Sequence, residues 1–332
     1  MKTILTSMLA ATALTASAFA ASHGEIDPAV VYDLGGKFDK SFNEAAYNGA
    51  ERFKEETGTE YAEFEIQNDA QREQALRRFA ERGNSPIVMA GFSYGNALEK
   101  VAADFPDTQF VIIDAVVDAP NVRSVVFKEQ EGSYLAGIAA AMAAESGKVG
   151  FVGGMDIPLI RRFACGYVGG AKSAGATDVF ENMTGTTGAA WNDPVRGGEL
   201  AKNQISQGAD VVYHAAGGTG VGVLQAAADA GKLGIGVDSN QNGLQPGSVL
   251  TSMLKKVDVA LYDAMMDAKN GEFTTGVEVL GLKEGGVDLA MDDNNADLMS
   301  EEMVAAIDDA KAKIVSGEIE VHDYMSDESC PY

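Results

Sequence analysis

Short apolar segments alternate with glycine-containing loops and amphipathic segments along this chain, and this alternation constrains its fold more than any other feature. In the first example, Val30–Gly49, an apolar run ends at Asp33, two glycines and a polar loop follow, and a helix begins near Ser41. Ser41 and Glu44 have the spacing of a capping box, in which each side chain bonds a backbone N–H of the first turn. The stretch therefore predicts a strand, a loop and a helix N-terminus, with room for a ligand at the strand's carboxyl end.

Phe42 is a large aromatic residue within this polar loop. It suits stacking on a flat ligand, and Asp33 and Asn43 are placed to hydrogen-bond the ligand's edge. The alternative is a hydrophobic staple, in which Phe42 packs back on its own helix. The residues alone leave both interpretations open.

The same pattern continues in two series, each with helical segments between its strands. We expect strands at Ala62–Gln67, Pro86–Gly91, Gln109–Asp114 and Val122–Phe127, then from Lys148, near Val179, and at Ala209–His214, Leu233–Asp238, Ser248–Met253 and Val277–Leu282. Strand after helix after strand indicates parallel sheets with right-handed crossovers. Because 332 residues exceed what one core usually serves, ~250–300 residues, we predict an α/β fold with two doubly wound lobes.

Residues 1–20 have the composition of a secretory signal peptide. Lys2 precedes a run of apolar and small residues, and two A-x-A cleavage sites follow within 16–20. No cysteine lies near that junction, and no later stretch has the ~18 uninterrupted apolar residues of a membrane span. We expect a soluble periplasmic protein, exported by a cleaved signal and without a lipid anchor.

The charge balance excludes two classes of partner. The chain has 49 acidic and 25 basic residues, a net charge of −24. Such a surface repels phosphate backbones and anionic lipids, so neither nucleic acid nor a membrane surface is an expected partner.

Cys165 and Cys330 are the two cysteines of the chain. An even number in an oxidising compartment favours one disulfide between the C-terminal tail and the second half of the chain. The alternative is two free thiols.

Two further loops are candidate ligand contacts. Gly217–Gly222 lacks the spacing of a dinucleotide fingerprint and the ending of a P-loop, but a ligand can approach the backbone at such a turn. Asp238 follows a strand, as Asp33 does, and its carboxylate can accept two hydrogen bonds from a vicinal diol. The alternative for Asp238 is a cap on the following turn.

The inventory for catalysis is thin. The three histidines, His23, His214 and His322, have no metal-ligand spacing, and the sequence has no G-x-S-x-G elbow. The acidic loop Asp288–Asp297 lacks the calcium-loop pattern. An exported protein with two α/β lobes and ligand-facing loops suggests a substrate-binding protein, and we predict no enzymatic activity, metal or cofactor.

The whole chain after the leader resembles the basic membrane protein family of ABC-transporter substrate-binding proteins, whose fold is that of type I periplasmic binding proteins. The motifs that carry the resemblance are D-x-G-G-x-x-D-K-S-F-N at Asp33–Asn43, E-x-x-Y-L-A-G at Glu131–Gly137, G-G-M-x-I-P at Gly153–Pro158, A-G-G-T-G-x-G at Ala216–Gly222, G-V-D-S-x-Q at Gly236–Gln241 and S-x-x-K-x-V-D at Ser252–Asp258. Members characteristically bind purine nucleosides. The resemblance implies a receptor that captures a purine nucleoside or base and delivers it to an inner-membrane ABC permease, as a monomer.

The resemblance also implies roles for particular residues. Phe42 would stack on the base, with Asp33 and Asn43 on its edge. Asp238 and Lys255 would hold the ribose hydroxyls.

Gly218 would line the same pocket. A second stacking aromatic is expected just before the A-G-G-T-G turn, where this chain has Tyr213-His214-Ala215, and we expect His214 to take that face. This departure keeps a different flat heterocycle, such as riboflavin, open as the ligand.

Lobe boundaries follow from the resemblance as well. One lobe would comprise residues 24–127 and 254–278, and the other residues 128–253 and 279–332, with three crossings as the hinge. Ligand binding would close the cleft, because each lobe supplies part of the site. An exported nucleoside hydrolase is the alternative of another class, and it would need an acid/base pair or a metal cluster in the cleft.

Overall fold

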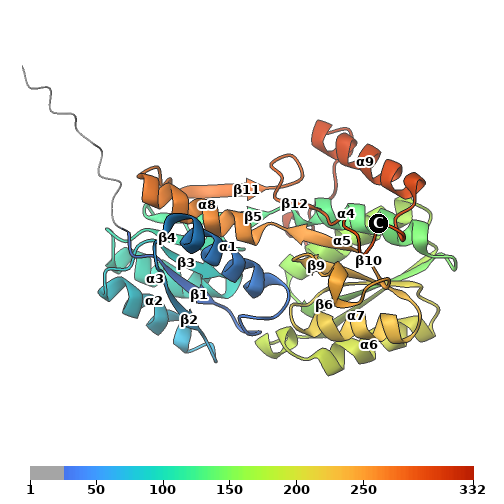
Figure 1. Ribbon diagram of the computed structural model, residues 1–332, viewed down its shortest axis with the longest axis horizontal. Coiled ribbons are helices and arrows are strands. Elements are labelled where there is room, and N and C mark those ends of the chain that lie inside the picture. The colour runs from blue at the N-terminus through green and yellow to red at the C-terminus, as the bar shows by residue number, and fades with distance from the viewer. Residues whose placement is uncertain (1–25) are drawn as a thin grey trace, which may run out of the picture.

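A computed structural model describes residues 26–332, which form two α/β lobes lying side by side (Figure 1). Residues 1–25, with the predicted signal peptide and His23, lie outside the described residues. The predicted α/β fold of two doubly wound lobes is confirmed. No helix within residues 26–332 has the length and apolar composition to cross a membrane.

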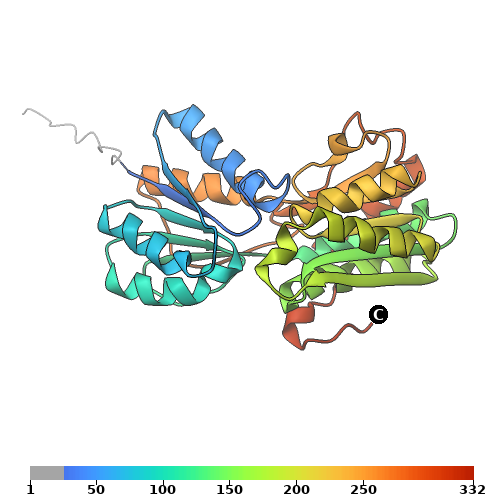
Figure 2. The same cartoon turned by 90° about the horizontal axis from the view of Figure 1, so that it is seen from below.

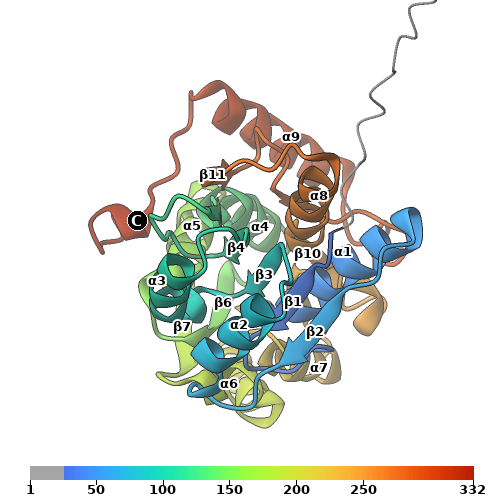
Figure 3. The same cartoon turned by 90° about the vertical axis from the view of Figure 1, so that its left-hand side faces the viewer.

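The first lobe is built on a parallel sheet in the order β11-β5-β4-β3-β1-β2. Its strands are β1 (Ala29–Tyr32), β2 (Ala62–Glu65), β3 (Ile87–Ala90), β4 (Phe110–Ile113), β5 (Val122–Phe127) and β11 (Gly276–Leu280), and its helices are α1 (Phe42–Thr57), α2 (Gln71–Glu81), η1 (Phe92–Tyr94), α3 (Gly95–Asp104) and α8 (Val257–Asn270). Helices α1 and α8 cover one face and α2 and α3 the other (Figure 3). Both faces are buried, which explains the continuous apolar runs.

The second lobe has the order β12-β10-β9-β8-β6-β7, parallel except for β12. Its strands are β6 (Lys148–Met155), β7 (Asp178–Gly185), β8 (Val211–Ala215), β9 (Leu233–Asp238), β10 (Val249–Lys255) and β12 (Val287–Leu289). Its helices are α4 (Glu129–Ala143), α5 (Pro158–Ser173), η2 (Gly188–Trp191), α6 (Pro194–Ser206), α7 (Thr219–Asp229), η3 (Asn242–Leu244), α9 (Glu301–Ser316) and η4 (Tyr324–Ser326). The expected loop Asp288–Asp297 begins inside β12, because its first residues extend the sheet as an antiparallel edge strand.

The chain passes between the two sheets three times: after β5, after β10 and between β11 and β12. Backbone hydrogen bonds join these passages, from Lys128 N to Leu280 O at 3.0 Å and from Lys256 N to Gly286 O at 2.9 Å. The lobes are therefore connected by adjacent, mutually bonded segments at their narrower middle (Figure 2).

A disulfide joins Cys165 on α5 to Cys330, with Cα atoms 5.6 Å apart. The tail after α9, residues 317–332, is thereby fixed on the second lobe. The structure thus contains the predicted disulfide between the tail and the second half of the chain.

Helices α4 and α5 approach each other unusually closely, because glycines face each other's backbone. A Cβ at Gly137 would overlap the carbonyl oxygen of Tyr167, and one at Gly170 would overlap that of Tyr134. The small residues of α4 thus serve a helix–helix contact, which sets the start of α4 beside α5.

We predict that Gly137→Ala lowers the free energy of unfolding by about 3 kcal/mol, the upper part of the roughly 1–3 kcal/mol that overpacking costs. Gly95→Ala is the matched control, because its Cβ would lie 3.9 Å from the nearest atom, the Cβ of Ala115. Urea unfolding measures both variants. Equal stability of the two would contradict the close packing of α4 on α5.

Candidate ligand-binding site

The carboxyl ends of the strands in both sheets meet at a cavity of about 580 Å³, its open mouth included. Its lining comes from both lobes: Asp33, Phe42, Phe92 and Asp114 from the first, and Phe163, Trp191, Asp238 and Lys255 among those from the second. Parallel strands place ligands at this edge of a sheet, and here two such edges face each other.

Asp33 follows β1 and lies at the cavity with one oxygen already engaged. Its Oδ1 accepts from Arg72 Nη2 at 2.5 Å and from the backbone N–H of Leu34 at 2.8 Å. The other oxygen lies against Gly91, where a Cβ would be 2.5 Å from it. Arg72 and Gly91 thus fix the carboxylate and leave Oδ2 for a ligand at the cavity wall.

Asn43 lines the cavity, but the backbone of the loop occupies its amide. Its Oδ1 accepts from Asp33 N–H at 3.2 Å, and its Nδ2 donates to the carbonyls of Asp33 at 3.2 Å and Gly36 at 3.3 Å. Both amide hydrogens are used, so Asn43 holds the shape of the loop.

The start of α1 differs from the predicted capping box. Asp39 caps the helix: its oxygens accept from the backbone N–H groups of Ser41, Asn43 and Glu44 at 2.8–3.1 Å. The Ser41 hydroxyl donates to Asp238 of the other lobe, so it makes no cap. The capping-box prediction is wrong because a long-range partner takes the hydroxyl.

Hydrogen bonds join the lobes beside this helix start. Ser41 donates to the carboxylate of Asp238, Ser239 Oγ donates to Ser41 O at 2.9 Å, and Gln241 Nε2 donates to Lys40 O at 2.7 Å. Asp238 has a left-handed backbone, with φ 63°, as the strand turns into this contact. The helix that presents Phe42 is therefore held against the second lobe.

Lys255 ends β10 and is 2% exposed. Its ammonium lies 2.7 Å from Asp114 and 2.9 Å from Glu129. It also lies 5.2 Å from the ring centroid of Phe42 and 5.1 Å from that of Phe127. A cation placed over ring faces and between carboxylates is held at one point of the cavity wall.

Trp191 supplies a further aromatic wall, which sequence reasoning did not identify. Its ring lies against the backbone of Gly154, where a Cβ would overlap it, and stands edge-on to Phe92 at 6.5 Å. The hydroxyl of Thr219 donates to Ala190 O at 2.8 Å and accepts from Asp193 N at 2.7 Å, which fixes the loop on both sides of Trp191.

His214 does not line the cavity, contrary to the expectation that it supplies a stacking face. It is fully buried, its ring lies against the backbone of Gly220, and its Nε2 bonds Gln241 Oε1 at 2.9 Å. Successive residues of a strand point to opposite faces, so Ala215 reaches the cavity and His214 faces α7. Burial lowers the pKa of His214 to about 4, which keeps the ring neutral.

Gly218 also lies behind the cavity wall, which its neighbour Gly217 lines. A Cβ at Gly218 would be 3.3 Å from Trp191 O and 3.7 Å from the Cβ of Asp39. Its small size serves the contact between the lobes.

Asp39, Asp114 and Asp238 have raised pKa values at the cavity. Burial raises the pKa of Asp39 to about 7, against its three backbone bonds. Burial raises the pKa of Asp114 to about 6, against the attraction of Lys255, and raises that of Asp238 in the same way. Burial alone would lower the pKa of Lys255, but Asp114, Glu129 and Asp238 raise it above its ordinary value. The ammonium therefore stays charged at neutral pH.

Several of these residues carry a signal in the sequence. Asp114 ends an apolar strand, as Asp33 and Asp238 do, so the rule that identifies those two identifies it as well. Asp39 stands two residues before Ser41, in the position of a cap for the next turn. Trp191 has no such signal, because it reaches the cavity from a loop. Among the described residues, no group of three His, Cys, Asp or Glu side chains is arranged to hold a metal ion.

Two α/β lobes that enclose a cavity between the ends of their strands define a two-lobed solute-binding protein. The chain matches the family described as ABC transporter substrate-binding protein PnrA-like over residues 26–324, and it belongs to this family. The resemblance to basic membrane proteins is confirmed. Members are receptors of ABC transporters and not enzymes, so a small-molecule ligand and a permease are the partners.

Individual relatives agree with this assignment. The chain is 33% identical over 320 residues to the ABC transporter nucleoside-binding protein BmpA of Lactococcus lactis, covering 90% of this chain and 89% of the relative. It is 36% identical over 283 residues to an uncharacterized lipoprotein of Pyrococcus furiosus, covering 79% and 69%. A solved ABC transporter solute-binding protein of Aeropyrum pernix superposes with a TM-score of 0.83 at 32% identity, covering 90% and 93%.

We predict that Asp39 makes the free energy of unfolding depend on pH. Its pKa rises from 3.8 to about 7 on folding, so its contribution is full below pH 3.8 and is lost as the pH rises through 7. The stability of the wild type relative to Asp39→Asn should fall by on the order of 2 kcal/mol between pH 5 and pH 8. Urea unfolding at both pH values measures this difference.

The exposed Asp107 provides the control, since Asp107→Asn should show the same difference from the wild type at both pH values. A difference for Asp39→Asn that does not change with pH would contradict the prediction.

Proposed function

We propose that this protein is the receptor of an ABC importer for a purine nucleoside or purine base. The observation that carries the proposal is the composition of the cavity wall. Aromatic rings from both lobes, Phe42, Phe92 and Trp191, lie beside carboxylates that accept hydrogen bonds. Rings suit the faces of a flat heterocycle, and carboxylates suit its N–H edge and the hydroxyls of a sugar.

The charge of the cavity supports a nucleoside over a nucleotide. In the part of the chain the structure describes, four aspartates and one lysine line the cavity, and Lys255 already pairs with Asp114 and Glu129. A phosphate would meet these carboxylates with no free cation beside it. The Lactococcus lactis relative is named a nucleoside-binding protein, which agrees with this class of ligand.

The proposed roles follow the two halves of the cavity. Phe42 stacks on the base, with Trp191 as the second aromatic wall in place of His214, and Asp33 accepts from the base edge. Asp238 and Lys255 bind the ribose hydroxyls. Asn43 acts through the loop that it holds.

The lobes would open and close about the three crossings. Because Lys255 still pairs within β10 and Leu280 within β11, residues 26–127 and 256–280 would move against residues 128–255 and 281–332. Ligand favours the closed arrangement because its partners come from both lobes. We further propose export to the periplasm, which cell fractionation after expression tests directly. The Pyrococcus furiosus relative is named a lipoprotein, and recovery of this protein in the membrane fraction would contradict the proposal.

Phe42→Ala should weaken nucleoside binding by on the order of tens of fold, since a base–aromatic stack is worth roughly 1–3 kcal/mol. Isothermal titration calorimetry measures the change. Phe38→Ala is the control: Phe38 lies in the same loop, 59% exposed, and does not line the cavity. Wild-type affinity in Phe42→Ala would remove the stacking role.

Mass spectrometry of small molecules released from the purified, denatured protein tests the function as a whole. A released purine nucleoside supports the full proposal. A bare purine keeps the stacking site and removes the ribose roles of Asp238 and Lys255. A flavin or another unrelated solute contradicts the purine class, and free base formed on incubation with guanosine indicates a hydrolase.

A further inference from the structure

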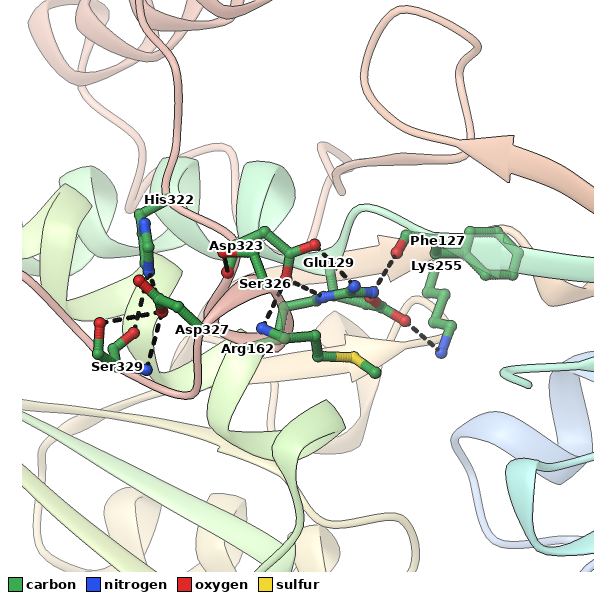
Figure 4. Close-up of polar contacts among 10 residues, drawn as sticks. Phe127, Glu129, Arg162, Lys255, His322, Asp323, Ser326, Asp327 and Ser329 are labelled. Carbon is green, nitrogen blue, oxygen red and sulfur yellow. Dashed lines mark hydrogen bonds and ion pairs between the residues drawn. The ribbon is translucent and has the colours of Figure 1, made fainter. Parts of the chain in front are cut away.

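Arg162 is a nearly buried arginine that does not line the cavity. It lies on α5 beside Phe163, which lines the cavity, and its side chain is 12% exposed. The neighbouring Arg161 makes a surface pair with Asp156, whereas Arg162 connects the interior to the C-terminal tail (Figure 4).

Arg162 uses its guanidinium on two sides. Nη1 donates to Glu129 Oε2 at 3.0 Å and to the carbonyl oxygen of Phe127 at 2.8 Å. Nε and Nη2 donate to the two oxygens of Asp323 at 2.8 and 2.9 Å. This two-point pair with Asp323 fixes the plane of the guanidinium and so its direction toward Glu129.

Glu129 is shared between two cations. It is fully buried at the first position of α4; Oε2 faces Arg162, and Oε1 lies 2.9 Å from the ammonium of Lys255. Charges therefore alternate from the tail to the cavity wall: Asp323, Arg162, Glu129 and Lys255. The row runs from the partly exposed Asp323, whose side chain is 35% exposed, to the fully buried Glu129, and the position of each charge in it depends on its neighbours.

The tail that carries Asp323 is bound along one face of α5. Besides the ion pair at Arg162, Cys330 is bonded to Cys165, and the ring of Tyr332 lies against Gly169, where a Cβ would be 2.6 Å from it. Positions 162, 165 and 169 recur at the spacing of one helix face. The tail is thus attached to α5 at Asp323, Cys330 and Tyr332.

We infer that the C-terminal tail, residues 317–332, is a positioning element of the ligand site, acting through Asp323, Arg162 and Glu129 on the ammonium of Lys255. Without Asp323, the guanidinium keeps Phe127 O and Glu129 as partners but loses the two-point pair that fixes its plane, so its hydrogen bond to Glu129 weakens. Glu129 then attracts Lys255 more strongly and draws the ammonium away from the ligand. This inference rests on the proposed function, in which Lys255 binds the ribose of a nucleoside.

The experiment compares guanosine with guanine, because only the nucleoside uses Lys255. Calorimetric titration of Asp323→Asn should show guanosine affinity lowered by about 5- to 10-fold, the lower end of typical couplings between sites. Guanine affinity should stay at the wild-type value. Glu320→Gln, an equal loss of charge at an exposed position of the same tail, should change neither affinity.

Equal loss of both affinities in Asp323→Asn would show a general structural effect and overturn the inference, as would no loss of either. If the wild type binds neither guanosine nor guanine, the proposed function fails for these two purines, and amide hydrogen exchange of the ligand-free protein then tests the role of the tail. Faster exchange at the start of α4, where Glu131 N donates to Lys128 O, in Asp323→Asn and not in Glu320→Gln supports the tail's role. Unchanged exchange there overturns it.

Discussion

The site and the contact between the lobes both depend on the ion pairs of the buried Lys255 ammonium with Asp114 and Glu129. A buried cation is costly unless carboxylates surround it, and here Asp114 comes from the first lobe and Glu129 from the start of α4 in the second. Lys255 itself ends β10, immediately before the chain crosses to α8. The candidate ligand site and the connection between the lobes are therefore parts of one electrostatic unit.

The architecture is largely predictable from the sequence, because helices cover both faces of each sheet. Such strands must be continuously apolar, and the runs at residues 86–91, 109–114 and 209–214 are visible for that reason. Asp33 and Asp238 are predictable from the same pattern, since both come at the end of an apolar strand, at the edge where the lobes meet. The Asp114 carboxylate obeys the same rule.

The remaining parts of the site depend on residues far apart in the chain. The hydroxyl of Ser41 bonds Asp238, 197 residues away, so the local capping pattern is misleading and Asp39 caps the helix. A single step along β8 decides between His214 and Ala215 as the residue at the cavity, and the aromatic expectation gave the wrong one. Trp191 belongs to no periodic strand or helix pattern that would predict its position at the cavity, so the sequence alone does not indicate it.

The three crossings between the lobes have a mechanical consequence. They lie side by side and are hydrogen-bonded to one another, from Lys128 to Leu280 and from Lys256 to Gly286. Parallel straps of this kind resist twisting of one lobe about the long axis of the molecule, and they yield most easily to bending across their common line. The connection therefore restrains the relative orientation of the two lobes more than a single flexible linker would.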